Sequence, residues 1–233
     1  MISNFLIIGG SSGIGKKLVV DLLKDNNKLI VSSRQPINDP DIVDADHIIF
    51  NANEPKPLSL PVDRLDGLVY CPGTINLKPF HRIKPSAFEE EWKVNFMGAV
   101  HVIQESLSLL KKSSHASIVL FSTVAVQNGM SFHASIAAAK GAIEGLVRSL
   151  AAEFAPKIRV NCIAPSIVDT PLAGKLLSTP EKIVASGNRH PLQRVGEISD
   201  ITAAVKFLLL KESSWMTGQI MAVDGGMSSI RPL

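Results

Sequence analysis

Short, mainly apolar runs alternate along the chain with longer segments in which apolar residues recur at helical spacing. The runs cover residues 5–8, 28–32, 47–50, 68–70, 117–121, 159–163 and 219–223. Helical spacing follows the glycines at 9–15 as far as about residue 25, and covers residues 87–110, 135–155 and 200–210. Strands without polar alternation, each followed by a helix, are typical of a parallel sheet buried on both faces. The pattern therefore predicts an α/β fold, a doubly wound Rossmann-type parallel sheet of about seven strands.

A single domain over residues 1–233 is expected, because this length suits one α/β core and is short for two. Hydrophobic residues make up 45% of the chain and charged residues 19%, which disfavours disorder. The net charge of +3 comes from scattered lysines and arginines, so no nucleic-acid surface is expected. The cysteines and histidines lack metal-ligand spacing, so no metal site is expected. No long apolar run or signal-peptide pattern occurs, which predicts a cytoplasmic protein without a membrane span.

A glycine-rich loop joins the first predicted strand to the first helix; its residues are Gly9, Gly10, Ser11, Ser12, Gly13, Ile14 and Gly15. Glycines let the backbone approach a pyrophosphate, and the free N–H groups of a helix start bind anions. This position predicts a dinucleotide-binding loop, against the alternative of a merely flexible turn. An ATPase phosphate loop is a second alternative, because Gly10 to Lys16 fits most of that motif. Lys17, however, stands where the ATPase motif needs Ser or Thr to hold magnesium.

Further motifs follow the loop in order, and together they resemble the short-chain dehydrogenase/reductase family nearly end to end. They are Ile8-Gly9 to Gly15 with Ile8 in place of Thr, Tyr70-Cys71-Pro72-Gly73 as a degraded Asn-Asn-Ala-Gly, Val94-Asn95, Arg159-Val160-Asn161 to Pro165-Ser166, Thr170, Thr217-Gly218-Gln219 and Asp224-Gly225-Gly226. The resemblance implies a Rossmann fold, a nicotinamide cofactor and a small-molecule substrate. It also implies that Gly73 and Asn51 lie against the cofactor, Asn51 near its adenine, and that Val168 and Thr170 hold the nicotinamide amide.

The end of the second predicted strand distinguishes the two nicotinamide cofactors. NAD-binding proteins place an acidic residue here to bind the ribose 2′-hydroxyl. This chain has Ser32-Ser33-Arg34 and no acid. A guanidinium pairs bidentately with a 2′-phosphate, and Ser33 can add a hydroxyl. The sequence therefore predicts NADP(H); the alternative is that Arg34 is an ordinary solvated arginine.

The resemblance also implies an active site, but its acid is missing. The family uses a Tyr as proton donor, a Lys four residues later, a Ser thirteen residues before the Tyr, and a helical Asn that holds a relay water. The corresponding residues here are Ile136, Lys140, Thr123 and Asn95. The chain has one tyrosine, Tyr70, so no Tyr-x-x-x-Lys motif exists. Isoleucine has no exchangeable proton, and carbonyl reduction by the family's usual route is therefore disabled.

His133 is a possible substitute donor, because it lies seven residues before Lys140 and histidine exchanges protons near neutral pH. In the wider superfamily, enoyl reductases place their Tyr at this spacing. The alternative is a solvent-exposed loop histidine. A water bound by the lysine near Asn95 is another possible donor. The substrate lid is expected at about residues 171–195. Asp169, His190 and Arg194, in or near it, are expected to be solvated loop residues; the alternative is that they contact the substrate.

Two functions follow from these residues. The first is an NADP(H)-dependent oxidoreductase with an altered proton donor, acting on a small carbonyl or activated alkene. In it Thr123 polarises the oxygen, Lys140 binds the ribose and Asn95 holds water. The second is a pseudoenzyme that binds NADP(H) without turnover and has a sensing, scaffolding or partner-binding role. The missing tyrosine favours the second function, and the glycine loop is compatible with both.

Residues 135–155 predict a homo-oligomer, a dimer or a tetramer. Their apolar or small side chains cover more than the roughly 100° stripe that a surface helix needs. The surplus predicts a second buried face, and members of the family often assemble about two-fold axes. Light scattering at micromolar concentration should therefore give a mass that is a multiple of the chain's; a monomer would contradict the prediction.

Overall fold

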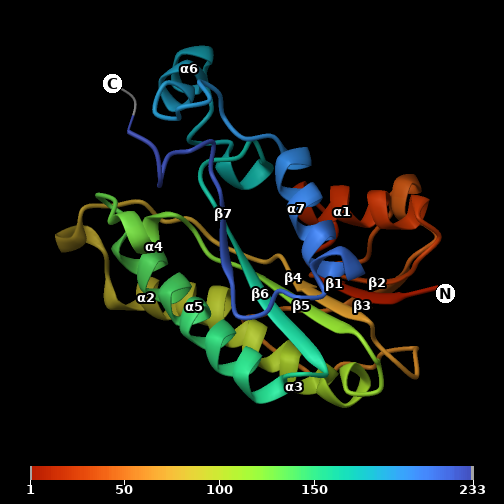
Figure 1. Cartoon of the computed structure of the whole chain (residues 1–233). Helices are drawn as coiled ribbons and strands as arrows, with labels where there is room; N and C mark the ends of the chain where they lie inside the picture. The colour runs from red at the N-terminus through yellow and green to blue at the C-terminus, as the bar shows by residue number, and fades with distance from the viewer. Residues whose placement is uncertain (1, 232–233) are drawn as a thin grey trace.

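A seven-stranded parallel sheet forms the centre of the molecule. The computed structural model describes residues 2–231, with the strands in the order β3-β2-β1-β4-β5-β6-β7 (Figure 1). The strands are β1 (Asn4–Ile8), β2 (Lys28–Ser33), β3 (Asp46–Ile49), β4 (Gly67–Tyr70), β5 (Ala116–Phe121), β6 (Ile158–Pro165) and β7 (Ile220–Val223). The predicted doubly wound α/β fold is confirmed.

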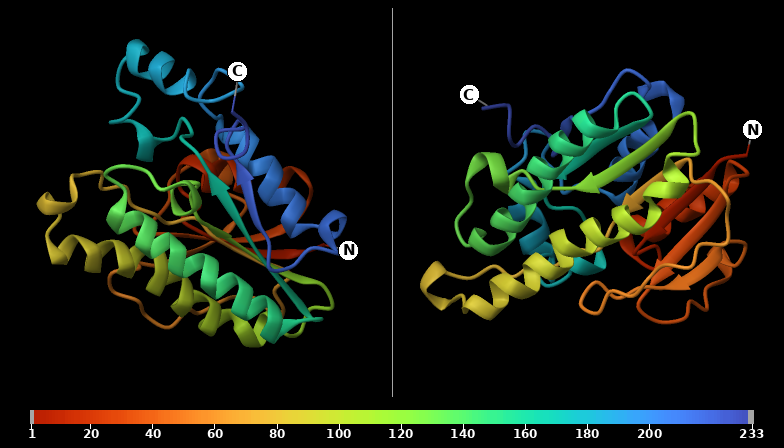
Figure 2. Two further views of the ribbon diagram at one scale, coloured as in Figure 1. Left: turned by 60° about the vertical axis from the view of Figure 1, so that its left-hand side comes forward. Right: turned by 90° about the horizontal axis from the view of Figure 1, so that it is seen from below.

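Helices cover both faces of the sheet. One layer is formed by α1 (Gly13–Lys24) and α7 (Ile198–Leu209), which contact each other. The other is formed by α2 (Pro85–Trp92), α3 (Gly98–Leu110) and α5 (Ala134–Phe154), with α3 and α5 side by side in both views of Figure 2. The short helix α4 (Ala125–Asn128) follows β5, and α6 (Pro180–Gly187) lies in the predicted lid region. No helix within residues 2–231 combines the length and the apolar character needed to cross a bilayer.

The two apolar clusters explain why the strands lack polar alternation. Phe5 and Ile7 of β1 pack in the cluster under α1 and α7, whereas Leu6 and Ile8 pack in the cluster under α3 and α5. Successive side chains of a strand point to opposite faces, so a sheet covered twice needs apolar residues at every position.

The segment predicted as one helix at 87–110 contains a π-helical turn. α2 ends at Trp92, the π turn covers Lys93–Met97, and α3 starts at Gly98. Such insertions often occur at functional sites, and they leave a carbonyl group without its usual amide partner. Here the Asn95 side chain satisfies the Glu91 carbonyl.

The single tyrosine has a structural position. The Tyr70 hydroxyl donates a hydrogen bond of 2.6 Å to the Val94 carbonyl in the π turn, and the side chain is 2% exposed. Gly98 is required beside it, because a Cβ there would collide with the Tyr70 hydroxyl and approach Ala52 to 2.8 Å. Tyr70 therefore joins β4 to the helical layer and does not reach the cavity described below.

The sheet topology brings the predicted loops together. Strand order reverses between β1 and β4, which lie side by side but are followed by connections that run in opposite directions. At the carboxyl ends of these strands, a Cβ on Gly9 would lie 3.1 Å from the Pro72 side chain. This is the position at which open α/β sheets bind their ligands.

Candidate active site

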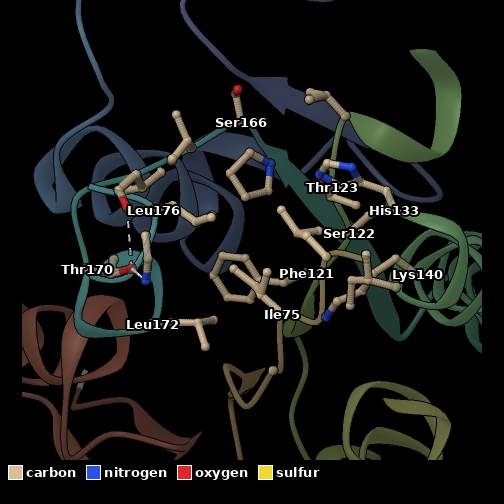
Figure 3. Close-up of a pocket in the computed structure, with 18 of the residues that line it drawn as sticks. Ile75, Phe121, Ser122, Thr123, His133, Lys140, Ser166, Thr170, Leu172 and Leu176 are labelled. Atoms are coloured by element: carbon tan, nitrogen blue, oxygen red, sulfur yellow. Dashed lines mark hydrogen bonds between the residues drawn. The ribbon is translucent and has the colours of Figure 1, made fainter. Parts of the chain in front are cut away.

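A cavity of about 340 Å³ lies beyond the carboxyl ends of β4, β5 and β6 (Figure 3). All four residues predicted to be catalytic line it, together with Ile14, Gly73, Val168 and Thr170 of the predicted cofactor set; the four are Asn95, Thr123, His133 and Lys140. The lid contributes Leu172 and Leu176. Residues far apart in the sequence, such as Ile14 and Leu176, thus share one hollow, and the cavity is large enough for a small ligand.

Lys140 is buried on α5 with 7% of its surface exposed. Burial disfavours the ammonium and lowers the pKa of Lys140 to about 8, although the nearby Cys162, Cys71 and Glu91 oppose the shift. A Cβ on Gly73 would lie 4.0 Å from Lys140 Nζ, so the loop after β4 passes close to the amine. At neutral pH most of the lysine is protonated, and its pKa lies in the range useful for proton transfer.

Asn95 is fully buried in the π turn and is held by three hydrogen bonds. Its Nδ2 donates to the Glu91 carbonyl at 2.9 Å and to Thr74 Oγ1 at 2.8 Å, and its Oδ1 accepts from the Thr74 amide at 3.3 Å. The side chain therefore satisfies a carbonyl in the helix and fixes the loop that contains Gly73. This arrangement positions the loop beside Lys140.

Thr123 directly follows β5 and is part of the cavity wall. Its Oγ1 accepts the Ala125 amide at 3.3 Å, and the hydroxyl proton has no acceptor among the described residues, so it remains available to a ligand. The preceding Ser122 hydroxyl instead donates to the buried Glu144 on α5 at 2.7 Å. Thr123 is thus the hydroxyl of this pair that can serve a substrate.

Ile136 lies on the cavity-facing side of α5 with Lys140, because a spacing of four residues returns to one helix face. His133, just before α5, lines the same cavity. Ile136 is 5% exposed and closes the wall one turn before the lysine. His133 precedes the first residue of α5 and lies 2.7 Å through Nδ1 from the Ser131 carbonyl, so Nδ1 carries a proton. The cavity wall is thus apolar where the resemblance implies a phenol, with a half-buried imidazole beside it.

The glycine loop fits a phosphate group. Ser12 precedes α1 without a capping hydrogen bond from its side chain, and the first turn of α1 contains no acidic residue. The Ser11 and Ser12 side chains are exposed. Gly9 and Gly13 have φ of +77° and +54°, and a Cβ on Gly15 would collide with the Gly9 carbonyl. Free amides at a helix start, approached by glycine backbone, are suited to a diphosphate.

At the end of β2, Arg34 agrees with the prediction of a free 2′-phosphate contact, whereas Ser33 does not. Arg34 is exposed and forms no ion pair with the described residues. The Ser33 hydroxyl, however, already donates to the Gln35 carbonyl and lies 2.9 Å from His47 Nε2. His47 was not identified from the sequence, since only the pairing of β2 with β3 brings it to Ser33.

The remaining predicted cofactor contacts lie in loops at the same edge. Asn51 follows β3 with its Oδ1 accepting the Asn53 amide at 3.1 Å. The Thr170 hydroxyl donates to the Val168 carbonyl at 3.3 Å and also accepts the Ala173 amide at 3.3 Å. Val168 and Thr170, in the loop after β6, therefore have fixed positions at the cavity wall.

One lid residue, His190, differs from the expectation of a solvated loop. His190 is 2% exposed; its Nδ1 lies 2.8 Å from the Ser186 carbonyl and its Nε2 lies 2.8 Å from Ser166 Oγ. Arg194 is exposed, as expected, and forms two hydrogen bonds of 2.7 and 2.9 Å with Asp200 at the surface. Asp169 is exposed, as expected. The one sequence feature that points to the contact between His190 and Ser166 is Ser166 itself, because it stands where the family motif has glycine.

The described residues contain no group of three or more His, Cys, Asp or Glu side chains that could hold a metal ion. The cavity therefore offers amine, imidazole, amide and hydroxyl groups for chemistry. The one thiol that lines it, Cys71, does not add a nucleophile, because burial raises the pKa of Cys71 to about 12.

Comparisons with known proteins agree with this geometry. A sequence model of the family described as enoyl-(acyl carrier protein) reductase matches residues 58–228. A tropinone reductase homologue of Arabidopsis thaliana is 34% identical over 245 residues, covering 96% of this chain and 91% of the relative. A second homologue from the same plant is 38% identical over 73% of this chain, but the match spans only 65% of its own length. L-xylulose reductase of Bos taurus is 30% identical and covers 95% and 94% of the two chains.

Among solved structures, the ligand-free aldohexose dehydrogenase of Thermoplasma acidophilum superimposes with a TM-score of 0.88 at 27% identity, covering 100% of this chain and 96% of that one. The family match begins after β3, so it omits the glycine loop, whereas the longer matches include almost the whole chain.

Glu91 is a buried acid beside this site. It lies one turn before Asn95, is 2% exposed, and neither of its oxygens has a hydrogen-bond partner among the described residues. Burial raises the pKa of Glu91, and the neighbouring Ser135 hydroxyl, Asn76 amide and Lys140 charge do not reverse the shift. A raised carboxyl pKa means that the folded protein binds the proton more tightly than the unfolded chain. The contribution of Glu91 to stability is therefore lost as the pH rises through the pKa that its carboxyl has in the folded protein.

We predict that Glu91→Gln increases the free energy of unfolding by about 1 kcal/mol at neutral pH, because glutamine cannot ionise. The gain should vanish at about pH 4, where the wild-type carboxyl is protonated. Urea unfolding of both proteins at the two pH values measures it. Glu89→Gln, an exposed acid on the same helix, is the matched control and should change neither value. A loss of stability at neutral pH would show instead that the carboxylate is a paired, stabilising ion.

Proposed function

The chain belongs to the short-chain dehydrogenase/reductase family, and from this we propose that it is an NADP(H)-dependent oxidoreductase acting on a small carbonyl or activated alkene. The observation that supports the proposal most is that Lys140, Thr123 and Asn95 line one cavity with the residues after β6. Residues that would contact a nicotinamide and residues that would contact a reacting oxygen thus border the same space.

NADP(H) fits the residues at the carboxyl edge of the sheet. The uncapped start of α1 and the glycines at 9–15 would hold the diphosphate, and Arg34 would pair with the 2′-phosphate. Asn51 and Gly73 would flank the adenosine and the nicotinamide riboside, and Val168 and Thr170 would bind the carboxamide. When bound, the nicotinamide ring supplies or accepts a hydride.

Proton transfer is assigned to Lys140. In reduction, the carbonyl carbon gains a hydride and the oxygen gains a proton. Thr123 would donate a hydrogen bond to that oxygen, and the Lys140 ammonium would supply the proton directly or through a water near Asn95. A pKa of about 8 suits an acid that works near neutral pH. His133 is the second candidate donor, because its ring faces the same cavity.

A pseudoenzyme that binds NADP(H) without turnover is the second candidate function. Ile136 favours it, since the cavity wall is apolar one turn before Lys140. The assignments of a homo-oligomer and of a cytoplasmic location stay predictions. Leu146 and Leu150 on α5 are only partly buried within one chain, which is consistent with a second covered face.

We predict that NADPH binds more tightly than NADH, and that Arg34→Ala weakens NADPH binding by about tenfold or more, because it removes a charge-assisted contact to the 2′-phosphate. NADH affinity should change little. Calorimetric titration of both cofactors measures this, with the exposed Arg82→Ala as the matched control. Equal or tighter binding of NADH by the wild-type protein would contradict the cofactor assignment.

Turnover tests the reaction itself. A panel of ketones, aldehydes and enones should include at least one that consumes NADPH, followed by absorbance. Lys140→Met should reduce that rate by about a hundredfold or more, and the wild-type rate should fall as pH rises above about 8, where the ammonium is lost. Ile136→Tyr should increase the rate, because it adds a phenol beside the lysine.

The variants also separate the two donors and the two functions. A large loss in His133→Ala together with a small loss in Lys140→Met would transfer the role of acid to the histidine. Tight NADPH binding without turnover on any panel member, with activity gained only in Ile136→Tyr, would establish the pseudoenzyme and overturn the oxidoreductase.

A further inference from the structure

One end of the cavity is formed by the lid and by the residue that follows β6. Arg189 and Ser186 come from the end of α6 and the segment after it, and Ser166 comes directly after β6. In Figure 3, Ser166 lies apart from Lys140, with Thr123 and Ser122 between them in the view. A ligand whose reacting carbonyl is at Thr123 and Lys140 would therefore extend another part toward Ser166 and the lid.

The charges that line the cavity have one sign. Its titratable nitrogen groups are His133, Lys140 and Arg189, and no Asp or Glu is among its lining residues. Arg189 donates to Ser186 Oγ at 3.3 Å and forms no ion pair with any described residue. The remaining wall is mainly apolar and includes Ile75, Leu77, Met130, Leu172 and Leu176. Cationic groups between apolar walls favour an anionic ligand and repel a basic one.

Ser166 is held in place by a buried histidine. Because a backbone carbonyl only accepts, His190 Nδ1 carries the proton toward Ser186, and Nε2 faces Ser166 Oγ at 2.8 Å. The other close neighbour of the hydroxyl is Met227 Sδ at 3.1 Å, a weak acceptor that a carboxylate oxygen would replace. In the neutral ring, Nε2 accepts the Ser166 proton. When both ring nitrogens carry a proton, Nε2 donates to Ser166 and the hydroxyl proton is free for such an oxygen. Neither Ser166 nor His190 has a role in the reaction described above.

We propose that the substrate is a carbonyl compound with an apolar body and a carboxylate, and that Arg189 and Ser166 bind the carboxylate while His190 positions Ser166. The assignment rests on the proposed function for the position of the reacting carbonyl. A guanidinium and one directed hydroxyl match a planar carboxylate, whereas a phosphate would leave oxygens without donors. A polyhydroxylated substrate would place hydroxyls against the apolar lining without hydrogen-bond partners.

The test compares matched pairs of compounds that differ only in charge, such as 3-oxooctanoate and its methyl ester. With NADPH, kcat/KM for the acid should exceed that for the ester by about tenfold or more, the size of one charge-assisted contact. Arg189→Gln should remove this preference by raising KM for the acid while leaving the ester within about twofold. Ser166→Ala should reduce the preference in the same direction, and His190→Asn should do so through KM rather than kcat. Lys182→Gln is the matched control, because it removes a charge from the exposed side of α6, outside the cavity.

Calorimetric binding of 3-oxooctanoate to the NADP⁺-loaded protein separates this proposal from the proposed function. Acid binding that Arg189→Gln weakens by about tenfold or more supports the subsite even when no compound turns over. Turnover of neutral carbonyls with no preference for the acid overturns the subsite and leaves the oxidoreductase intact. A ketone with a phosphate monoester that binds more tightly than the acid overturns the carboxylate assignment. Absence of both binding and turnover overturns both proposals.

Discussion

A parallel sheet with helices on both faces leaves little surface along its strands where a side chain could meet a ligand. Every position of β1 after Asn4 is buried, and β4 and β5 are buried along their whole length. Groups that bind or react must therefore lie where the strands end. The reversal of strand order between β1 and β4 opens that edge, and the loops after β4, β5 and β6 enclose the cavity there. The site depends on this topology more than on any single contact.

The electrostatics of the cavity depend on burial. Lys140 lies among two thiols and a buried acid, none of which pairs with it as a close counterion, and the pKa of the amine falls accordingly. The neighbouring Ile136, one turn before the lysine, makes this wall apolar. A lysine that is easily deprotonated, beside an apolar wall, is better suited to giving up a proton than a surface lysine is. Burial beside this apolar wall also favours an anionic partner for the Lys140 ammonium.

Several details of the site exceed what local sequence patterns can convey. The segment at 87–110 has helical spacing throughout, yet it contains a π turn, because Asn95 finds partners in the loop after β4. His190 was expected in solvent because it lies in a polar lid segment, but packing against the residue after β6 buries it. Ser33 was expected to face the cofactor, but its hydroxyl is already engaged by groups that only the β2–β3 pairing brings near.

By itself, the sequence determined the fold class, the glycine loop and the order of the motifs, because these follow from local periodicity and from backbone geometry within a few residues. It also determined that Ile136 and Lys140 share one side of a helix, since helical spacing is a local property. The absence of a Tyr-x-x-x-Lys pair needed only the composition. Tertiary structure alone decided that Lys140 is buried, that Asn95 locks the Thr74 loop, and that His190 supports Ser166 across 24 positions of chain. Such contacts join segments distant in sequence, and their formation depends on the packing of the whole sheet and its two helical layers.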